Sequence, residues 1–287
     1  MPPKQKRQKI DHKSKGHENN GGGNSTGTPN TLQIPTDPAS ISQKFLDIEA
    51  EQCKELLKLQ YGQGQLLVYN PLDYASQIHH DFVSKFCRGP KKVLLLGMNP
   101  GPWGMGQTGV PFGHVDYARD WLEVKGEVTK PVNEHEKRPI SGLNCKRKEV
   151  SGDRMWSLLK QLSGTPEVLF TNIFLHNYCP LYFLKDSAKN VTPPELKVHE
   201  RAELEKVCNR ALVQVVDLLG VEHVIGVGNY AAERARKALT NEGREDIKVS
   251  TLMHPSPVNP AANKGWANIA IKQLTDNKTI EYFKSST

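Results

Sequence analysis

The sequence predicts an α/β fold, a three-layer αβα domain with a central four-stranded parallel sheet. Four short apolar runs, near Val93, Val168, Val224 and Val249, are bounded by Gly, Pro or Asn, as is typical of buried parallel strands. Helical patterns separate these runs, so strands and helices alternate along the chain. After a polar N-terminal stretch, about 250 of the residues remain for this fold, which is an ordinary size for one domain.

The N-terminal stretch, residues 1–38, is expected to be a disordered basic tail, and residues 39–287 are expected to form the folded domain. The tail is rich in Gly, Asn, Ser, Thr and Pro and nearly lacks large apolar residues. It cannot bury enough surface to offset the entropy of ordering. Its basic cluster at residues 4–9 fits a nuclear import signal or a nucleic-acid tether, with a merely solubilising tail as the alternative. We expect a nuclear protein.

The elements of the domain follow in order along the chain. Apolar residues at helical spacing predict helices, and the apolar runs predict strands. We expect helices over 40–57, 73–86, 116–124, 151–162, 192–220, 230–239 and 266–274, and strands over 93–96, 167–174, 223–228 and 247–253.

The clearest helix start is Thr192, because Thr192, Pro193 and Glu195 form a capping-box pattern. Gly220 is expected to end that helix. Residues 125–148 lack any such pattern and are expected to be irregular. They hold seven basic and three acidic residues, so they predict either a phosphate-facing surface or an ordinary solvated loop.

Composition excludes several classes of protein. No apolar run approaches the roughly 20 residues that cross a bilayer, and the N-terminus lacks the apolar core of a signal peptide. A cytosolic or nuclear protein without membrane contact follows. The five cysteines are widely spaced without a CxxC, which argues against zinc, iron–sulfur clusters and disulfides and favours free thiols in a reducing compartment.

The loops that follow the four strands predict where the site lies. Right-handed crossovers place the loops 97–113, 174–180, 228–230 and 253–264 at one edge of the sheet. Open α/β sheets bind ligands at this edge. The first loop is rich in Gly and Pro and holds Asn99 directly after a buried strand, so we expect Asn99 to be catalytic.

Asn177, in the second loop, has the chemistry to read a base. Its amide offers an acceptor beside a donor, and uracil presents the complementary N3–H and O4, whereas cytosine has both polarities reversed. Mispairing two buried groups costs about 2–6 kcal/mol, so a fixed Asn177 accepts uracil and rejects cytosine. A turn-forming asparagine is the alternative.

The third and fourth loops suit nucleic acid. Residues 226–231 match GxGxxA, the pattern of a dinucleotide site. That pattern normally opens the first βα unit, so we favour phosphate binding by the amides at Gly228 and Asn229, with a simple tight turn as the third interpretation. In the fourth loop, Pro255 and Pro257 stiffen a projection suited to wedging into stacked bases.

Two rings near these loops have candidate roles. His254 precedes the proline-rich projection and can donate to an oxygen that becomes anionic, although a lone histidine is more often structural. Phe112 can stack on a planar base, worth roughly 1–3 kcal/mol, or belong to the core.

Four segments, GMNPGPWGMGQTGVPFG, TNIFLHNYCP, GVGNYAAERAR and HPSPVNPAANKGW, occur in this order. Together they closely resemble the single-strand-selective monofunctional branch of the uracil-DNA glycosylase superfamily, over about residues 40–280. The resemblance implies a small parallel sheet flanked by helices. It also implies that Asn99 orients the attacking water, His254 stabilises the departing base, Phe112 stacks on the flipped base and Asn177 reads its Watson–Crick edge.

The resemblance further implies that Met98 and Gly101 bound the pocket near C5 of the base, where the family accepts uracil and oxidised forms such as 5-hydroxymethyluracil. Pro255, Ser256 and Pro257 would belong to a DNA-penetrating wedge. One position departs from the family pattern, because Val258 stands where vertebrate members carry an arginine. Valine fills space but cannot pair with a phosphate.

The expected activity is hydrolytic excision of uracil and 5-substituted oxidised uracils from single- and double-stranded DNA, which leaves an abasic site and an uncut strand. Neither a metal nor a cofactor is needed, and we expect a monomer. Lys264 is assigned to a phosphate contact. The alternatives are a mismatch-specific uracil/thymine glycosylase of the same superfamily, a non-catalytic nucleic-acid-binding α/β protein, and a dinucleotide enzyme.

Overall fold

A parallel sheet with strand order β3-β2-β6-β7 forms the centre of the computed structural model, which describes residues 37–284. Its strands are β2 (Val93–Gly97), β3 (Ile173–Asn177), β6 (His223–Val227) and β7 (Lys248–Leu252). Every residue of β2, β3 and β6 is buried, which explains their nearly continuous apolar sequences. The four-stranded parallel sheet of the prediction is confirmed.

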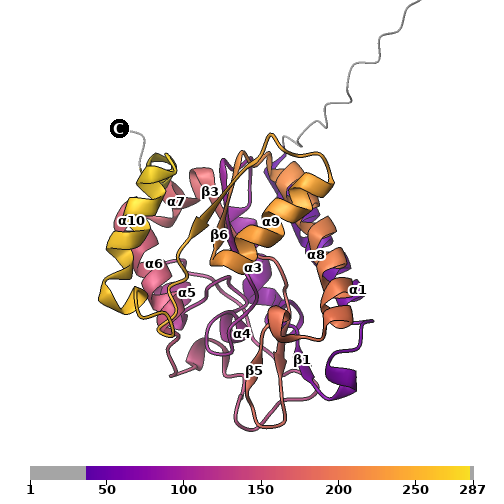
Figure 1. The fold of residues 1–287 in the computed structure, drawn as a ribbon. Helices are drawn as coiled ribbons and strands as arrows, with labels where there is room; N and C mark the ends of the chain where they lie inside the picture. Colours follow the sequence, from indigo (N-terminus) through magenta and orange to yellow (C-terminus); the bar gives the residue numbers. More distant parts are fainter. Residues whose placement is uncertain (1–36, 285–287) are drawn as a thin grey trace, which may run out of the picture. The chain divides into compact units, whose positions relative to one another are not determined.

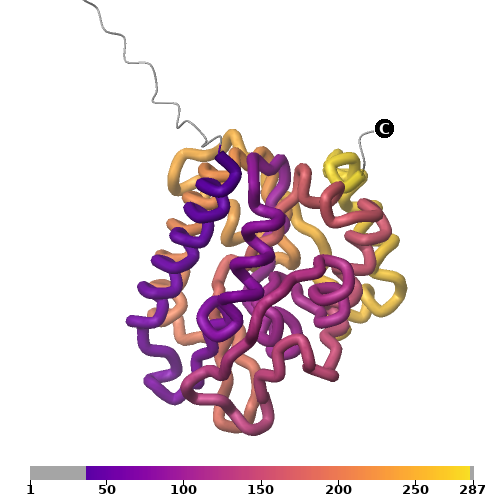
Figure 2. Tube along the Cα trace, turned by 180° about the vertical axis from the view of Figure 1, so that it is seen from behind, coloured from indigo at the N-terminus to yellow at the C-terminus, as the bar shows by residue number. Residues whose placement is uncertain are grey.

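Helices cover both faces of this sheet (Figure 1). On one side lie α1 (Pro38–Leu56), α3 (Ser76–Phe86), α8 (Val198–Leu219) and α9 (Asn229–Asn241), and on the other lie α6 (Val150–Ser163) and α10 (Trp266–Asp276). Figure 2 shows α1 and α3 side by side, and both place a phenylalanine against Phe174 of β3. The three-layer αβα architecture is therefore confirmed.

A second, antiparallel sheet has the order β1-β4-β5, with β1 (Leu67–Tyr69), β4 (Tyr182–Leu184) and β5 (Asn190–Val191). Its strands have two or three residues, too few to show an alternating pattern, and the sequence did not predict them. The remaining elements are short: η1 (Gly62–Gly64), α2 (Pro71–Tyr74), α4 (Met105–Thr108), α5 (Val115–Asp120), η2 (Gly142–Asn144), α7 (Pro166–Asn172), η3 (Pro193–Glu195), η4 (Ala262–Lys264) and η5 (Ile280–Phe283).

The predicted strand over 167–174 is wrong in most of its length. Residues 166–172 form helix α7, and β3 begins only at Ile173. Thr165 caps this helix by accepting from the Val168 N–H at 3.4 Å, and Pro166 occupies its first turn. These start signals outweigh the β-like apolar run.

The helix predicted from Thr192 begins later. Its capping box is present but encloses only the short η3, and α8 starts at Val198. Gly220 ends α8 in the left-handed conformation, as predicted. The helix predicted over 73–86 is divided at Ala75 into α2 and α3.

Residues 125–148 are irregular except for η2, as predicted. The basic cluster at residues 4–9 and most of the predicted tail lie outside the described residues. Between Asp37 and Lys284, no helix combines the length and apolar character that crossing a membrane requires.

Candidate active site

The loops after β2 and β3 are joined by a continuation of the strand pairing. The Tyr178 N–H donates to Gly97 O at 2.9 Å, and the Cys179 N–H donates to Met98 O at 3.0 Å. Met98 and Asn99 therefore lie alongside the loop that carries Asn177. The Asn99 side chain is half-buried, and its Nδ2 donates to Leu181 O at 3.2 Å. This bond leaves Oδ1 as the Asn99 atom that can accept from a water molecule.

Asn177 and Phe112 meet above Gly97. A Cβ at Gly97 would lie 2.1 Å from Asn177 Oδ1 and 2.8 Å from Phe112 Cζ, so only glycine fits there. The Asn177 side chain is buried, and its Nδ2 donates to Met105 Sδ at 3.0 Å. This contact holds the amide in one orientation, which discrimination between uracil and cytosine requires. Sequence reasoning missed Met105, because nothing near it in the chain indicates the contact.

Helix α6 holds the backbone at Phe112. Phe112 has a φ of 54°, in the region that favours glycine, and its ring is half-buried. Trp156 Nε1 donates to Phe112 O at 3.0 Å, and a Cβ at Gly152 would come within 2.5 Å of the same oxygen. The strained turn is therefore fixed by two residues of α6 that sequence reasoning did not select.

The loop glycines 101 and 104 make room for the Glu149 carboxyl group. A Cβ at Gly101 would lie 2.3 Å from Glu149 Oε1, and one at Gly104 would lie 2.5 Å from Oε2. Burial raises the pKa of Glu149 to about 7, although the backbone N–H groups of Trp103 and Gly104 oppose this shift. Gly101, predicted as a pocket wall, thus turns its bare side toward a buried acid.

A hydrogen bond to the His254 ring determines which of its nitrogens carries the hydrogen. The Ser256 N–H donates to Nδ1 at 3.1 Å, so Nδ1 is unprotonated and Nε2 carries the hydrogen. Burial lowers the pKa of His254, which keeps the ring neutral at pH 7. Gly228, at a φ of 88°, lies beside it, since a Cβ there would be 3.4 Å from His254 Cβ. The third and fourth loops therefore meet at a neutral N–H donor.

Hydrogen bonds from Arg154 and Asn263 hold the backbone of the proline-rich segment, residues 255–258. Arg154 of α6 donates to Pro255 O at 2.9 Å and to Asn263 Oδ1 at 2.8 Å, and Asn263 Nδ2 donates to Pro257 O at 2.8 Å. Val258 stands at the tip with 87% of its surface exposed. Sequence reasoning missed Arg154 and Asn263.

The strand order brings most of the predicted residues to one edge. Because β2 lies between β3 and β6, with Leu96 opposite both His176 and Gly226, the loops carrying Asn99, Asn177 and Gly228 are neighbours. Asn229 and Lys264 are exposed, at the start of α9 and the end of η4. Ser256 contributes its N–H to His254.

A buried polar cluster lies under the loops. Glu49 Oε2 is 2.6 Å from His79 Nε2, Glu49 Oε1 is 3.3 Å from His176 Nδ1, and His79 Nδ1 donates to Gly109 O at 2.8 Å. Burial acts to raise the pKa of Glu49, but the two histidines outweigh it and hold the value at about 2. Burial also opposes protonation of His79, yet Glu49 raises its pKa. The cluster is a charged pair that links α1 and α3 to the loop of Phe112.

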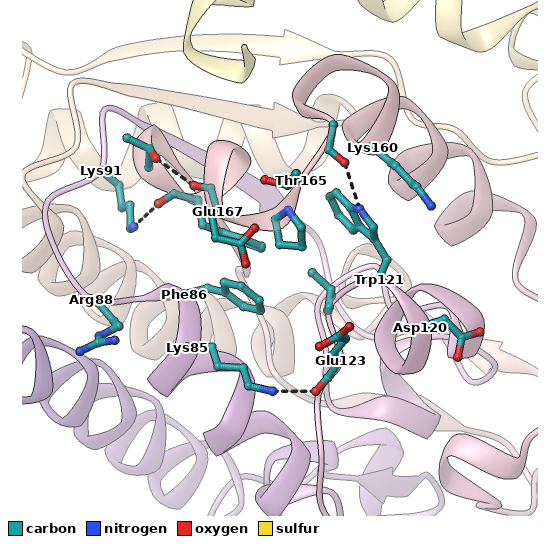
Figure 3. Close-up of a pocket in the computed structure, with 15 residues that line it drawn as sticks. Lys85, Phe86, Arg88, Lys91, Asp120, Trp121, Glu123, Lys160, Thr165 and Glu167 are labelled. Atoms are coloured by element: carbon teal, nitrogen blue, oxygen red, sulfur yellow. Dashed lines mark hydrogen bonds between the residues drawn. The ribbon is translucent and has the colours of Figure 1, made fainter. Parts of the chain in front are cut away.

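A separate cavity of about 750 Å³ lies at the opposite end of β2 and β3. Lys91, two residues before β2, and Phe170 of α7 both line it, and Figure 3 shows Lys91 directed at a backbone oxygen, that of Phe170. Burial lowers the pKa of Lys91 to about 8. None of the predicted site residues lines this cavity, so it is distinct from the edge that holds them.

Within residues 37–284 no group of three His, Cys, Asp or Glu side chains is placed to hold a metal ion. The five cysteines are free thiols.

Known proteins share this sequence and fold. The family model of the uracil DNA glycosylase superfamily matches residues 84–275. The single-strand selective monofunctional uracil DNA glycosylase of Bos taurus is 48% identical over 239 residues, which cover 83% of this chain and 88% of that protein. Its counterparts in Rattus norvegicus and Mus musculus are each 48% identical over 237 residues, 83% of this chain and 85% of each relative.

The crystal structure of SMUG2 from Pedobacter heparinus matches with a TM-score of 0.60 at 17% identity, over 84% of this chain and 98% of that one. This similarity shows a common fold. The family model and the mammalian relatives confirm the resemblance inferred from the four segments. The chain belongs to the uracil DNA glycosylase superfamily.

Proposed function

We propose that the chain excises uracil, and uracils with oxidised 5-substituents such as 5-hydroxymethyluracil, from single- and double-stranded DNA. As a member of this superfamily, it is a glycosylase that hydrolyses an N-glycosidic bond. The observation that carries the proposal is the pairing of a locked Asn177 amide with Phe112 above Gly97, at the same edge of the sheet as a neutral His254 donor. An abasic site and an intact strand are the products.

The leaving base determines the chemistry. Breaking the N-glycosidic bond develops positive charge on the sugar and negative charge on the base. The neutral His254 ring has its Nε2–H available to donate to an oxygen of the departing base, and a preorganised donor of this kind is typically worth ~10²–10³ in rate. The proton stays on Nε2 because Nδ1 already accepts from the Ser256 N–H.

Asn99 has the role of placing the water. An amide is a poor proton acceptor, so bond breaking runs well ahead of water attack. With Nδ2 held by Leu181 O, Oδ1 accepts from the water and orients it toward the sugar carbon. Once the bond to the base is broken, the water's oxygen forms the new bond to the sugar carbon, and the proton that the water loses neutralises the anionic base.

Asn177 and Phe112 select the base. The fixed amide accepts from N3–H and donates to O4 of uracil, and the Phe112 ring covers one face. Met98 is half-buried and Gly101 lacks a side chain, so we assign backbone in this part of the loop to the wall near C5. Gly101 contributes only backbone to this wall, because the side on which a Cβ would stand faces Glu149.

The segment 255–258 keeps the DNA bases unstacked at the position of the extruded nucleotide. Its two prolines, the Arg154 brace and the exposed Val258 tip suit insertion into the base stack. Asn229 and Lys264 are assigned to the phosphates, since Asn229 opens α9 and Lys264 is exposed. The predicted phosphate contact of the Gly228 amide is corrected, because the Gly228 N–H donates to Leu252 O at 2.8 Å.

The test uses oligonucleotides that carry one uracil, one 5-hydroxymethyluracil, one thymine opposite guanine, or none. Each is incubated with the protein, without metal or cofactor, and is then treated with alkali; the mismatch is tested as a duplex and the others in single- and double-stranded form. Alkali-labile breaks only at uracil and 5-hydroxymethyluracil are expected. Breaks at thymine would favour the mismatch-specific relative, and no breaks at all would contradict a glycosylase.

We also propose a nuclear location, on the basic cluster at residues 4–9. A fluorescent fusion of the full chain is expected to concentrate in the nucleus, and replacement of the lysines and arginine in the cluster by glutamine is expected to disperse it. Equal nuclear signal from both fusions would remove this role from the cluster.

A further inference from the structure

A groove of about 390 Å³ lies between residues 114–119 and residues 143–148. The second part belongs to the irregular basic segment, which runs across the lower part of the face seen in Figure 2. We propose that this groove binds phosphate groups of the DNA strand next to the extruded nucleotide. The proposal rests on the proposed function and adds a second phosphate site to it.

The charge of the groove is positive and partly unpaired. Lys148 and Arg119 share Asp116, at 2.9 Å and 3.2 Å. Lys146 and Arg147 also line the groove and, among the described residues, have no carboxylate within 4.0 Å. Positive side chains without a protein counter-ion are neutralised by salt ions, and a polyanion that binds them takes the place of those ions.

His114 supplies a second, independent sign of a missing partner. Its side chain lines the groove with only 3% exposure. Neither ring nitrogen has a hydrogen-bond partner among the described residues, although buried polar groups are almost always paired. Burial lowers the pKa of His114, so the ring is neutral at pH 7 and offers one N–H, which a phosphate oxygen satisfies.

Trp103 connects the groove to the active-site loop. The guanidinium of Arg147 lies 4.4 Å from the centroid of the Trp103 ring, and that of Arg138 lies 5.3 Å from it. A guanidinium stacked on a ring keeps its N–H edge free for bidentate contact with phosphate. Trp103 follows Asn99 by four residues and His114 follows Phe112 by two, so the groove adjoins the loop that carries both predicted site residues.

The test measures DNA binding and excision separately as salt is varied. Binding of a fluorescent single-stranded oligonucleotide without uracil is followed by anisotropy between about 50 and about 200 mM salt. The variants are Arg147→Gln, the double variant Lys146→Gln/Arg147→Gln, and His114→Phe. The matched controls are Arg88→Gln and Lys160→Gln, which remove charge at the cavity of Figure 3.

Each lost phosphate contact is expected to reduce the slope of log K against log salt by about 0.7. The double variant should therefore lose about 1.4 of slope, the controls nothing, and His114→Phe is expected to weaken binding about fivefold. Single-turnover excision at saturating enzyme should stay within about twofold of the unaltered chain, because no reacting group is removed.

Slopes and affinities equal to those of the controls would overturn the groove as a phosphate site. Loss of the saturating excision rate with unchanged slope would also overturn it, because the residues would then act on the active-site loop. Trp103→Phe, which keeps a ring for the guanidiniums, is expected to bind better than Trp103→Leu. The binding assay contains no uracil, so a failure of the glycosylase proposal leaves its result readable.

Discussion

At the scale of single residues, the site depends on groups whose orientation is fixed by a neighbour. Asn177 is held by Met105, Asn99 by Leu181 and His254 by the Ser256 N–H. None of these partners could be predicted from the sequence. The residue types identified the chemistry. The contacts that fix their orientation either join chain segments that lie far apart or involve backbone groups, which no distinctive side chain marks in the sequence.

Asn177→Asp tests base reading directly. A carboxylate accepts but cannot donate to O4 of uracil, and it repels that oxygen. We expect single-turnover uracil excision to fall by about 10²-fold, the effect of roughly 3 kcal/mol from one unmet buried contact and one repulsion. Asn241→Asp, at the exposed end of α9, is the control. An unchanged ratio of uracil to cytosine excision would remove Asn177 from base reading.

At the scale of elements, α6 organises the loop after β2. Trp156 and Gly152 hold Phe112, Arg154 holds the proline-rich segment, and Glu149 fills the space left by Gly101 and Gly104. The sequence predicted this helix by its apolar face. Its polar contacts were not predictable, because they join residues about 40 to 110 positions apart, which no local pattern encodes.

Glu149 gives a pH-dependent contribution that can be measured. Because burial raises its folded pKa from 4.5 to about 7, the folded state binds this proton more tightly than the unfolded state. Stability from this group is therefore full below about pH 4.5 and falls as pH rises to about 7. In Glu149→Gln, the free energy of unfolding is expected to decrease by up to about 3 kcal/mol less over this pH range than in the unaltered chain.

Urea unfolding at about pH 5 and about pH 8 measures this difference. The exposed Glu233→Gln on α9 is the control. If Glu149→Gln loses as much stability over this range as the unaltered chain, the buried-acid account of the loop is wrong.

Two helical elements, α7 and η3, differ from what the sequence predicts. The run Val168-Leu169-Phe170 is apolar in a manner that both a strand and a buried helix allow, and the cap at Thr165 with Pro166 decides for α7. At Thr192 the same kind of signal predicts a long helix, but its capping box closes only a 3₁₀ turn. Start signals locate a helical turn but do not determine how far the helix continues.

At the scale of the whole molecule, the alternation of strands and helices was enough to predict the layers and the edge that holds the site. The register and the strand order β3-β2-β6-β7 were not predictable, because they depend on which faces pack together. The cluster of Glu49, His79 and His176 shows this dependence. It joins three elements and reaches Gly109 in the loop of Phe112.

Glu49→Gln is expected to destabilise the fold by about 3–5 kcal/mol at pH 7, since it leaves a buried cation without its partner. Glu49 has a folded pKa of about 2. Its contribution is therefore present above about pH 4.5 and is lost as pH falls toward 2. Urea unfolding from about pH 7 to about pH 3 is the measurement, with the exposed Glu51→Gln on the same helix as the control. A loss below about 1 kcal/mol would show that the pair stabilises little.

The central claim is that a neutral His254 stabilises the departing base beside a water held by Asn99. The most direct test is the single-turnover rate constant for uracil excision by His254→Leu at pH 7.5, from a single-stranded oligonucleotide at saturating enzyme. We expect a fall of ~10²–10³ with the unfolding midpoint nearly unchanged. A rate constant within about threefold of the unaltered chain would contradict the account.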